Sequence, residues 1–201
     1  MVMLRSLAVL LVFGAVAVAA PLPKATFKKL KDYYPLAKGH TWTYLVGESE
    51  IVVVVTEFEE AKDGTKTAKL ATQVAGKSVA TESIRTGKDG IFRTHINDLA
   101  IEPPVQLLKF DKENEEWEIK SKMQTIEVTS SVKHLGEEKI EVKAGTYTAV
   151  KIRIKGEVSK IETEATYWLV EDVGIAKLEF TAGENQRGSL NLKSFKPGKE
   201  K

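Results

Sequence analysis

The sequence contains no cysteine, and this absence excludes several classes of protein at once. Without thiols the chain can form no disulfide, so its hydrophobic core must hold the fold without covalent cross-links. A bacterial lipoprotein carries its lipid on a cysteine just after the signal peptide, so that anchor is excluded as well. Zinc sites lose one of their two commonest ligands, and covalent catalysis loses its most reactive nucleophile.

Histidine is also scarce, with His40, His95 and His134 the three present. No His-x-His or His-Glu-x-x-His spacing occurs, so a metal site would require all three to converge in space. We expect each to be a strand-end or surface residue, and we predict no metal and no cofactor. Arg93 precedes His95 by two residues, which places both on one face of a strand. This pair is the sole basis for considering a hydrolase with dispersed residues.

Neither sign of charge dominates, because 30 Lys and Arg face 28 Asp and Glu. A chain so balanced has no field to attract nucleic acid, and its lysines and glutamates alternate where a nucleic-acid site would need a basic stripe with interleaved aromatics. Paired carboxylates such as Glu137-Glu138 fall in polar turns or at strand ends, where nothing raises their pKa. There is no Gly-x-Ser-x-Gly and no phosphate-binding glycine loop. We predict no catalytic residues and a protein that is not an enzyme.

A long uncharged run occurs only at the N-terminus. One positive residue, Arg5, precedes the apolar stretch Leu7 to Val18, and Ala17-Val18-Ala19 has the small residues of a cleavage site. This pattern predicts a signal peptide over residues 1–19 and a bacterial protein that is periplasmic or secreted, with no membrane anchor after cleavage. The alternative is an uncleaved anchor, since the run is at the lower limit of length for spanning a bilayer.

After residue 40 the dominant hydrophobic period is two, which is typical of strands with one dry face. In Glu116 to Gln124, for example, Trp117, Ile119, Ser121 and Met123 share one side. Residues that favour turns separate such runs, namely Asp63-Gly64, Asp89-Gly90, Gly136, Ala144-Gly145, Asp172-Val173-Gly174 and Ala182-Gly183. The pattern predicts about nine or ten strands joined in sequence as an antiparallel meander.

The predicted fold class is all-β: a curved antiparallel meander sheet forming an incomplete barrel, with one short N-terminal helix. Phe27, Leu30 and Tyr34 have helical spacing, which places that helix within Lys24 to Tyr34 and ends it before Pro35. No linker divides the chain. We therefore predict a single domain over residues 24–196 and a flexible tail over 197–201.

A meander of this length must curl, and its concave side offers a surface where an apolar ligand could bind. The candidate ligand-binding residues are the aromatic and apolar side chains expected to point inward: Trp42, Tyr44, Phe92, Trp117, Met123 and Tyr167. The alternative is that these side chains are ordinary core packing, because patterning alone cannot separate a filled core from an open one.

Several local motifs occur together in a fixed order across residues 33 to 180. They are Tyr33-Tyr34-Pro35-Leu36, Gly39 to Tyr44, Pro103-Pro104, Val142 to Tyr147, Tyr167 to Val170 and Val173 to Leu178. The set resembles a group of bacterial exported proteins of unknown function, which is similar to the lipoprotein-carrier (LolA-like) half-barrel architecture. That resemblance implies a curved sheet whose concave side accepts acyl chains, and it implies no catalytic residues.

The sequence therefore favours a non-enzymatic exported protein that binds an apolar or lipid-like ligand on the concave face of a curved sheet. An envelope module that binds a protein partner, or is structural, and takes no small ligand is the second interpretation. A hydrolase with dispersed residues is the third and weakest.

Overall fold

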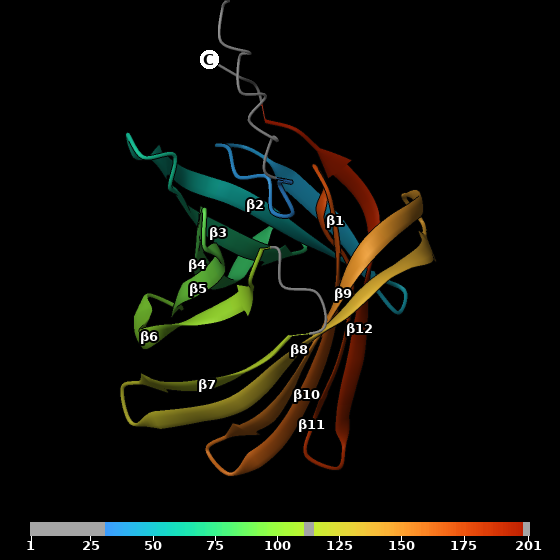
Figure 1. The fold of residues 1–201 in the computed structure, drawn as a ribbon. Helices are drawn as coiled ribbons and strands as arrows, with labels where there is room; N and C mark the ends of the chain where they lie inside the picture. Colours follow the sequence, from blue (N-terminus) through green and yellow to red (C-terminus); the bar gives the residue numbers. More distant parts are fainter. Residues whose placement is uncertain (1–30, 111–114, 199–201) are drawn as a thin grey trace, which may run out of the picture.

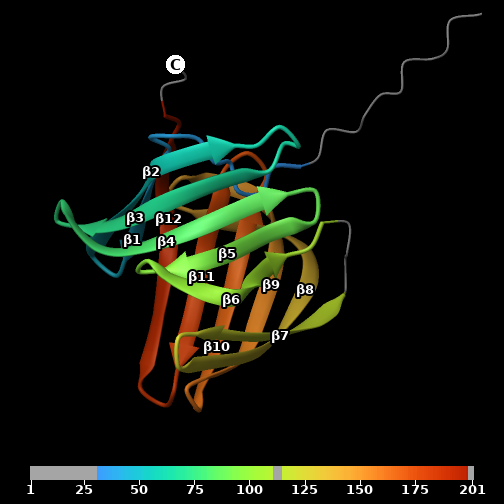
Figure 2. The same ribbon diagram turned by 90° about the vertical axis from the view of Figure 1, so that its left-hand side faces the viewer.

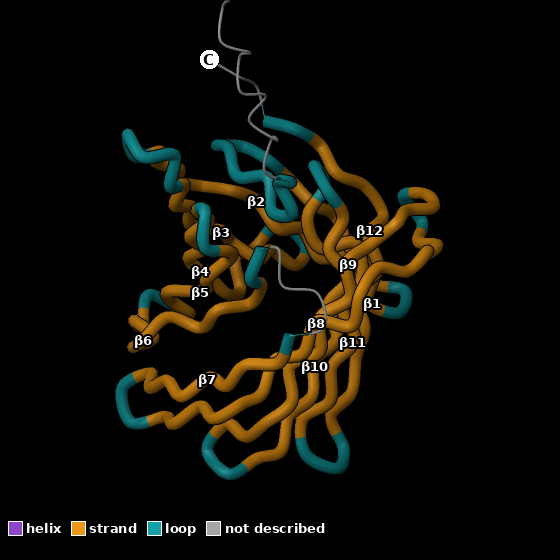
Figure 3. The backbone as a smooth tube through the Cα atoms, in the orientation of Figure 1, coloured by secondary structure: helices purple, strands orange, loops and turns teal. Residues whose placement is uncertain are grey.

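The computed structural model describes residues 31–110 and 115–198, and strands make up most of them (Figure 3). Their bounds are β1 Thr41–Val46, β2 Ser49–Glu60, β3 Lys66–Val74, β4 Lys77–Gly87, β5 Gly90–Ile96, β6 Leu99–Leu108, β7 Glu116–Met123, β8 Ile126–Val142, β9 Gly145–Val158, β10 Ile161–Val170, β11 Gly174–Ala182 and β12 Gln186–Lys196. The described residues contain no helix that is long and apolar enough to cross a membrane.

Each strand pairs antiparallel with the next, and β12 returns to pair with β1, so the sheet closes into a barrel (Figure 1). Trp42 of β1 pairs with Val53 of β2 on one side and with Phe195 of β12 on the other. The predicted antiparallel meander is confirmed. The predicted incomplete barrel is wrong, because the first and last strands find each other and leave no free edge there.

Closure is uneven around the barrel. Between β6 and β7 the described residues form a single backbone pair, Glu102 with Lys122. A side-chain bond supports this seam, since the indole nitrogen of Trp117 donates to the backbone oxygen of Gln106 at 3.2 Å. The neighbouring β7 and β8 pair along the whole of β7. The β6–β7 seam is thus the weakest junction of the sheet.

The barrel is flattened. Figure 2 shows β2 to β5 running across β9 to β12, so that two layers of strands face each other. Buried side chains of both layers belong to one core cluster. At one end the segment of residues 31–40 passes over the interior. The backbone oxygen of Asp32 accepts a bond from the Asp172 N–H at 2.7 Å, and its carboxylate lies 3.2 Å from the Lys66 ammonium. Asp32 therefore ties the two layers together.

The described chain has more strands than predicted because several of its turns lack a strong turn signal. Asn97-Asp98 and Ser159-Lys160 adopt left-handed backbone conformations without glycine. Gly136, which was predicted to be a turn, instead lies within β8 at a bulge between His134 and Glu137. A glycine with positive φ suits either structure, so the residue type could not distinguish them.

The N-terminal helix is not confirmed. Residues 24–30 of the predicted range lie outside the described residues, and residues 31–34 are not helical. The predicted signal peptide, residues 1–19, and the last residues of the predicted tail also lie outside the described part of the chain.

Candidate ligand-binding interior

The inner face of the barrel follows from the strand pairing, because directly paired residues of neighbouring strands point to the same side. Trp42, Leu70, Ile84 and Ile152 lie on this face and are almost completely buried. The predicted alternation in β7 is confirmed, since Trp117, Ile119 and Ser121 are buried while Glu116, Glu118 and Lys120 are exposed.

One end of the interior is filled. Trp42 is 1% exposed. Its ring stacks on that of Phe195, with the ring centroids 5.2 Å apart, and its centroid lies 5.9 Å from that of the Tyr34 ring. The Trp42 indole N–H donates to the Val173 backbone oxygen at 2.6 Å. The Tyr44 hydroxyl donates in the same way to the backbone oxygen of Ile175 at 2.9 Å. These contacts close the interior at the end that residues 31–40 cover.

Toward the other end the inner face is progressively uncovered. Along β10 the inner residues change from buried Tyr167 to half-buried Ala165, and along β12 from buried Leu192 to half-buried Leu190. On β11, Phe180 is 38% exposed. The facing layer shows the same loss of burial, since in β3 Leu70 is buried but Val74 is exposed.

We call this region the open half of the inner face. It comprises Ile51, Val53, Thr72, Val74, Ala80, Ile154, Ala165, Leu178, Phe180 and Leu190. Most of these side chains are apolar and only partly buried. The inner face beyond the filled half therefore carries apolar surface that solvent can reach.

A charged pair lies where the filled half meets the open half. Arg93 of β5 pairs with buried Ile84, and Glu82 is the next inward residue of β4. The Arg93 Nε donates to the Glu82 carboxylate at 2.8 Å, and each side chain remains 22% accessible. Since both side chains point inward, solvent reaches them from the barrel interior.

Tyrosine hydroxyls surround this pair. Burial raises the pKa of Tyr34 and of Tyr44, and the negative charge of Glu82 raises both further. Burial by itself would lower the pKa of Arg93, but Glu82, Tyr167 and Tyr34 together outweigh that effect and raise it. The arginine is therefore charged and the tyrosines neutral at any physiological pH. Arg93 also interacts with the Tyr167 hydroxyl, which places that residue beside the pair.

The candidate ligand-binding residues do not form one cluster. Trp42, Tyr44 and Tyr167 meet around Tyr34 in the filled half. Trp117 faces inward at the β6–β7 seam, with the Lys109 ammonium 5.0 Å from its ring. Met123, at the end of β7, is half-buried.

Phe92 differs from these residues. It pairs with Arg85, whose guanidinium lies 4.3 Å from its ring, and both residues lie between inward-pointing neighbours. Its ring therefore belongs to the outer face of the barrel. The assignment of these residues to ligand binding stays a prediction.

Sequence reasoning missed Glu82, Arg93 and Tyr34 as parts of this site. The available signal was a charge at a position where alternation calls for an apolar side chain. Glu82 falls between Ala80 and Ile84 in the inward pattern of β4, and Arg93 follows Ile91 in β5. A single charge in such a pattern is ambiguous, and the two lie eleven residues apart.

The expected juxtaposition of Arg93 and His95 is wrong. Ser83 pairs with His95 and its neighbour Ile84 pairs with Arg93, because the ladders on both sides of β5 contain a bulge near Thr94. Adjacent residues Ser83 and Ile84 point to opposite faces, and so do their partners. His95 thus lies on the outer face.

The histidines do not converge. His40 Nδ1 lies 3.2 Å from the Pro35 oxygen, at the filled end. His134 is not a surface residue, as had been expected: it is buried inside β8, and its Nδ1 accepts a bond from the Gly136 N–H across the bulge. Within residues 31–110 and 115–198 no group of three potential metal ligands occurs.

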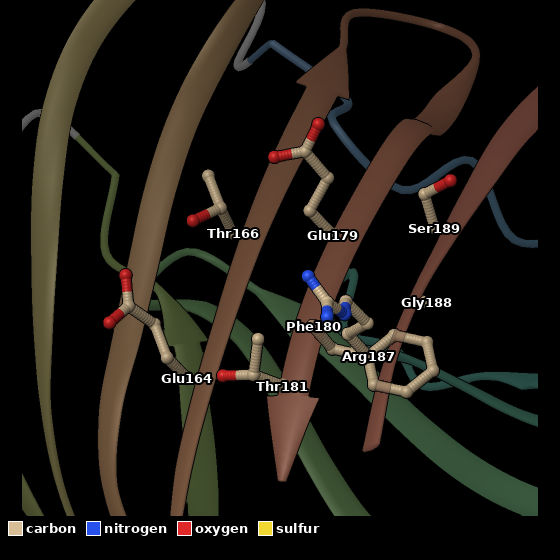
Figure 4. Close-up of a pocket in the computed structure, with 8 residues that line it drawn as sticks. All are labelled: Glu164, Thr166, Glu179, Phe180, Thr181, Arg187, Gly188 and Ser189. Carbon is tan, nitrogen blue, oxygen red and sulfur yellow. The ribbon is translucent and has the colours of Figure 1, made fainter. Parts of the chain in front are cut away.

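A depression of about 590 Å³ lies on β10, β11 and β12 (Figure 4). Its lining residues include Glu164, Thr166, Glu179 and Ser189, which share the outer face. Lys155 lies 3.9 Å from Glu164 and Lys177 lies 2.7 Å from Glu179. The depression also borders Phe180 and Gly188, and its two carboxylates are already paired with lysines.

Comparison with solved structures identifies relatives of the fold. A protein described as a candidate lipoprotein from Parabacteroides distasonis superposes with a TM-score of 0.58 at 15% identity, covering 84% of this chain and 100% of the other. A candidate exported protein with a YmcC-like fold from Bacteroides fragilis gives 0.57 at 13% identity, covering 84% and 99%. No family model and no curated protein matches the sequence. Identities this low establish a shared fold. Neither protein is described as a lipoprotein carrier, so the LolA-like resemblance stays a prediction.

Proposed function

We propose that this chain is a non-enzymatic exported protein that holds an apolar or lipid-like ligand against the open half of the inner face. The observation that carries the proposal is the loss of burial along that face, from Tyr167 and Leu192 to Ala165, Leu190 and Phe180. Apolar side chains that point into a barrel and yet remain accessible form a surface that an apolar molecule could cover favourably.

The proposal of export is supported from two directions. The N-terminal residues have the pattern of a signal peptide. The Bacteroides fragilis neighbour, which shares the fold, is described as exported. Within the described residues, the charged side chains Arg93 and Glu82 of the interior pair with each other, which favours a binding role over an enzymatic one.

The direct test is native mass spectrometry of the mature protein purified from the cell envelope, followed by solvent extraction. We expect a bound mass that disappears on extraction and an apolar compound in the extract. The extracted protein should then bind a fluorescent fatty acid in place of the ligand that was removed. Absence of both the bound mass and the uptake would overturn the proposal.

Two tryptophan variants locate the binding surface. Ala165→Trp fills the open half from β10, whereas Thr166→Trp places the same ring on the outer face one residue away. We expect Ala165→Trp to abolish uptake and Thr166→Trp to preserve it, with both proteins folded by circular dichroism. Equal uptake by the two variants would show that the ligand binds elsewhere.

An interaction module is a second candidate, favoured by the exposed apolar residues Val79 and Ile161 near hairpin ends. If these residues bind a partner, Val79→Ser and Ile161→Ser should abolish a stoichiometric complex in the envelope without changing fatty-acid uptake.

A further inference from the structure

The location of the Arg93–Glu82 pair on the inner face is not explained by a gain in stability. A buried ion pair is seldom better for stability than apolar residues of the same volume, because removing charges from water costs as much as their attraction returns. Yet these two side chains lie on an inner face that is otherwise mostly apolar, between buried Ile84 and half-buried Ala80. Stability by itself therefore does not account for the pair.

The pair lies at the inner limit of the open half. Ile84 and Ile91 fill the barrel on one side of it, and accessible side chains begin on the other. An elongated apolar molecule lying along the open half would thus bring one of its ends to Arg93. A purely apolar end would leave the accessible part of the guanidinium without a hydrogen-bond partner.

The groups around that end are mostly donors. A guanidinium has five N–H groups in a planar fork, and Glu82 engages the one on Nε. Arg93 also interacts with the side chain of Tyr167, and the buried hydroxyl of Tyr34 lies close enough to interact with Arg93 as well. The Glu82 carboxylate is already paired with Arg93. A site rich in donors matches an end group rich in acceptors.

We propose that Arg93, with Tyr167 and Tyr34, forms a subsite for the acidic head group of an amphiphile, a carboxylate or a phosphate monoester, whose tail lies along the open half. This inference rests on the proposed function. Arg93 binds the head group through its terminal nitrogens. Glu82 holds the guanidinium in position from the Nε side and lowers the net charge of the empty site.

The test compares three probes whose alkyl tails differ in length by at most one carbon: dodecanoic acid, dodecyl phosphate and methyl dodecanoate. Each is titrated into the extracted protein by native mass spectrometry at mildly alkaline pH, where both acids are ionised. We expect an acid to bind about tenfold more tightly than the ester, as a charge-assisted bidentate contact would give. Whichever acid shows the preference identifies the chemistry of the head group.

Variants of the pair make the test specific. Arg93→Gln should reduce binding of the preferred acid to the level of the ester and leave the ester within about twofold, because the tail contacts remain. Glu82→Gln should tighten acid binding, since it removes a competing carboxylate. The double variant E82Q/R93Q removes both charges of the pair, so that neither is left without the other, and its ester binding shows that the fold is intact. Arg187→Gln, on the exposed outer face, is the matched control and should change nothing.

The outcomes are distinguishable. If acids and ester bind equally, or if Arg93→Gln weakens all three probes alike, the subsite is wrong and the proposed function stands. If none of the probes binds and native protein carries no ligand, both proposals are wrong. A preference for an acid that survives in E82Q/R93Q would also overturn the subsite.

Discussion

The indole nitrogen of Trp42 donates a hydrogen bond at 2.6 Å to the backbone oxygen of Val173, a residue 131 positions later in the chain. This bond joins β1 to the turn between β10 and β11. The next residue, Gly174, has a φ of +99°, and a Cβ there would lie 3.2 Å from the same indole nitrogen. Trp42 and Gly174 are thus adapted to each other, and together they close the filled end of the barrel.

Trp42→Ala should lower the free energy of unfolding by about 3–5 kcal/mol, because it removes a fully buried ring and leaves a cavity among Tyr34, Phe195 and Gly174. Trp42→Phe, which keeps most of the ring volume but loses the bond to Val173, should cost less. Urea unfolding monitored by circular dichroism measures both losses. A Trp42→Ala loss below about 1 kcal/mol would mean that the filled end is not packed in solution.

Ser121→Ala should stabilise the protein. Among the described residues, Ser121 carries the one buried side-chain polar atom without a hydrogen-bond partner. Removing such a hydroxyl recovers its desolvation cost, for an expected gain of about 1 kcal/mol in chemical denaturation. Ser130, a buried serine on neighbouring β8, is the comparison, and Ser130→Ala should show no such gain. A loss of stability in Ser121→Ala would indicate that the hydroxyl is satisfied in solution.

Two glycines of the inner face should respond differently to alanine. A Cβ on Gly156 would lie 2.1 Å from the Thr129 oxygen and 2.4 Å from the Ser130 Cα, and backbone atoms cannot move aside. A Cβ on Gly188 would meet the Phe180 ring at 2.7 Å, but that ring is partly exposed and can rotate away. We expect Gly156→Ala to cost more than about 2 kcal/mol and Gly188→Ala less than about 1 kcal/mol. Thermal unfolding of both variants checks the order, which equal losses would contradict.

Glu138 should contribute a pH-dependent stability. The Trp168 indole N–H donates to this carboxylate and Lys151 lies beside it, so its pKa falls below the ordinary 4.5. Because the pKa is lower in the folded protein, Glu138 contributes fully to stability at pH values above its ordinary pKa of 4.5. This contribution is lost as the pH falls through the lower pKa of the folded state. Glu138→Gln should therefore be less stable than the native protein at neutral pH, with the difference shrinking in acid.

Melting temperatures measured between neutral and acidic pH test this expectation. The effect should be small, because the Glu138 side chain is 42% exposed. Glu118→Gln, at an exposed position of β7, is the control and should not reproduce the trend. A difference between Glu138→Gln and the native protein that stays constant with pH would contradict the assignment.

Local features of the fold were accessible from the sequence where the alternation was regular. In β7 the buried and exposed residues alternate as the pattern predicts. The period fails where a bulge adds a residue. The bulge near Thr94 separates Arg93 from His95, and the one at Gly136 lies inside a strand that had been expected to end there.

The candidate site was only partly accessible for a related reason. Trp42, Tyr44 and Tyr167 could be identified as inward-pointing, because that requires knowledge of one strand at a time. The role of Glu82 and Arg93 depends on how far the interior is filled around them, and this follows from side chains contributed by both layers and by the segment containing Tyr34.

By itself the sequence determined that this chain is a meander of antiparallel strands, because hydrophobic alternation and turn residues act over a few neighbouring positions. The tertiary structure decided that β12 pairs with β1, that one end of the barrel is filled and the other is open, and that a charged pair lies at their boundary. These properties arise from contacts between residues far apart in the chain, where the size and position of each partner matter and local periodicity carries no information.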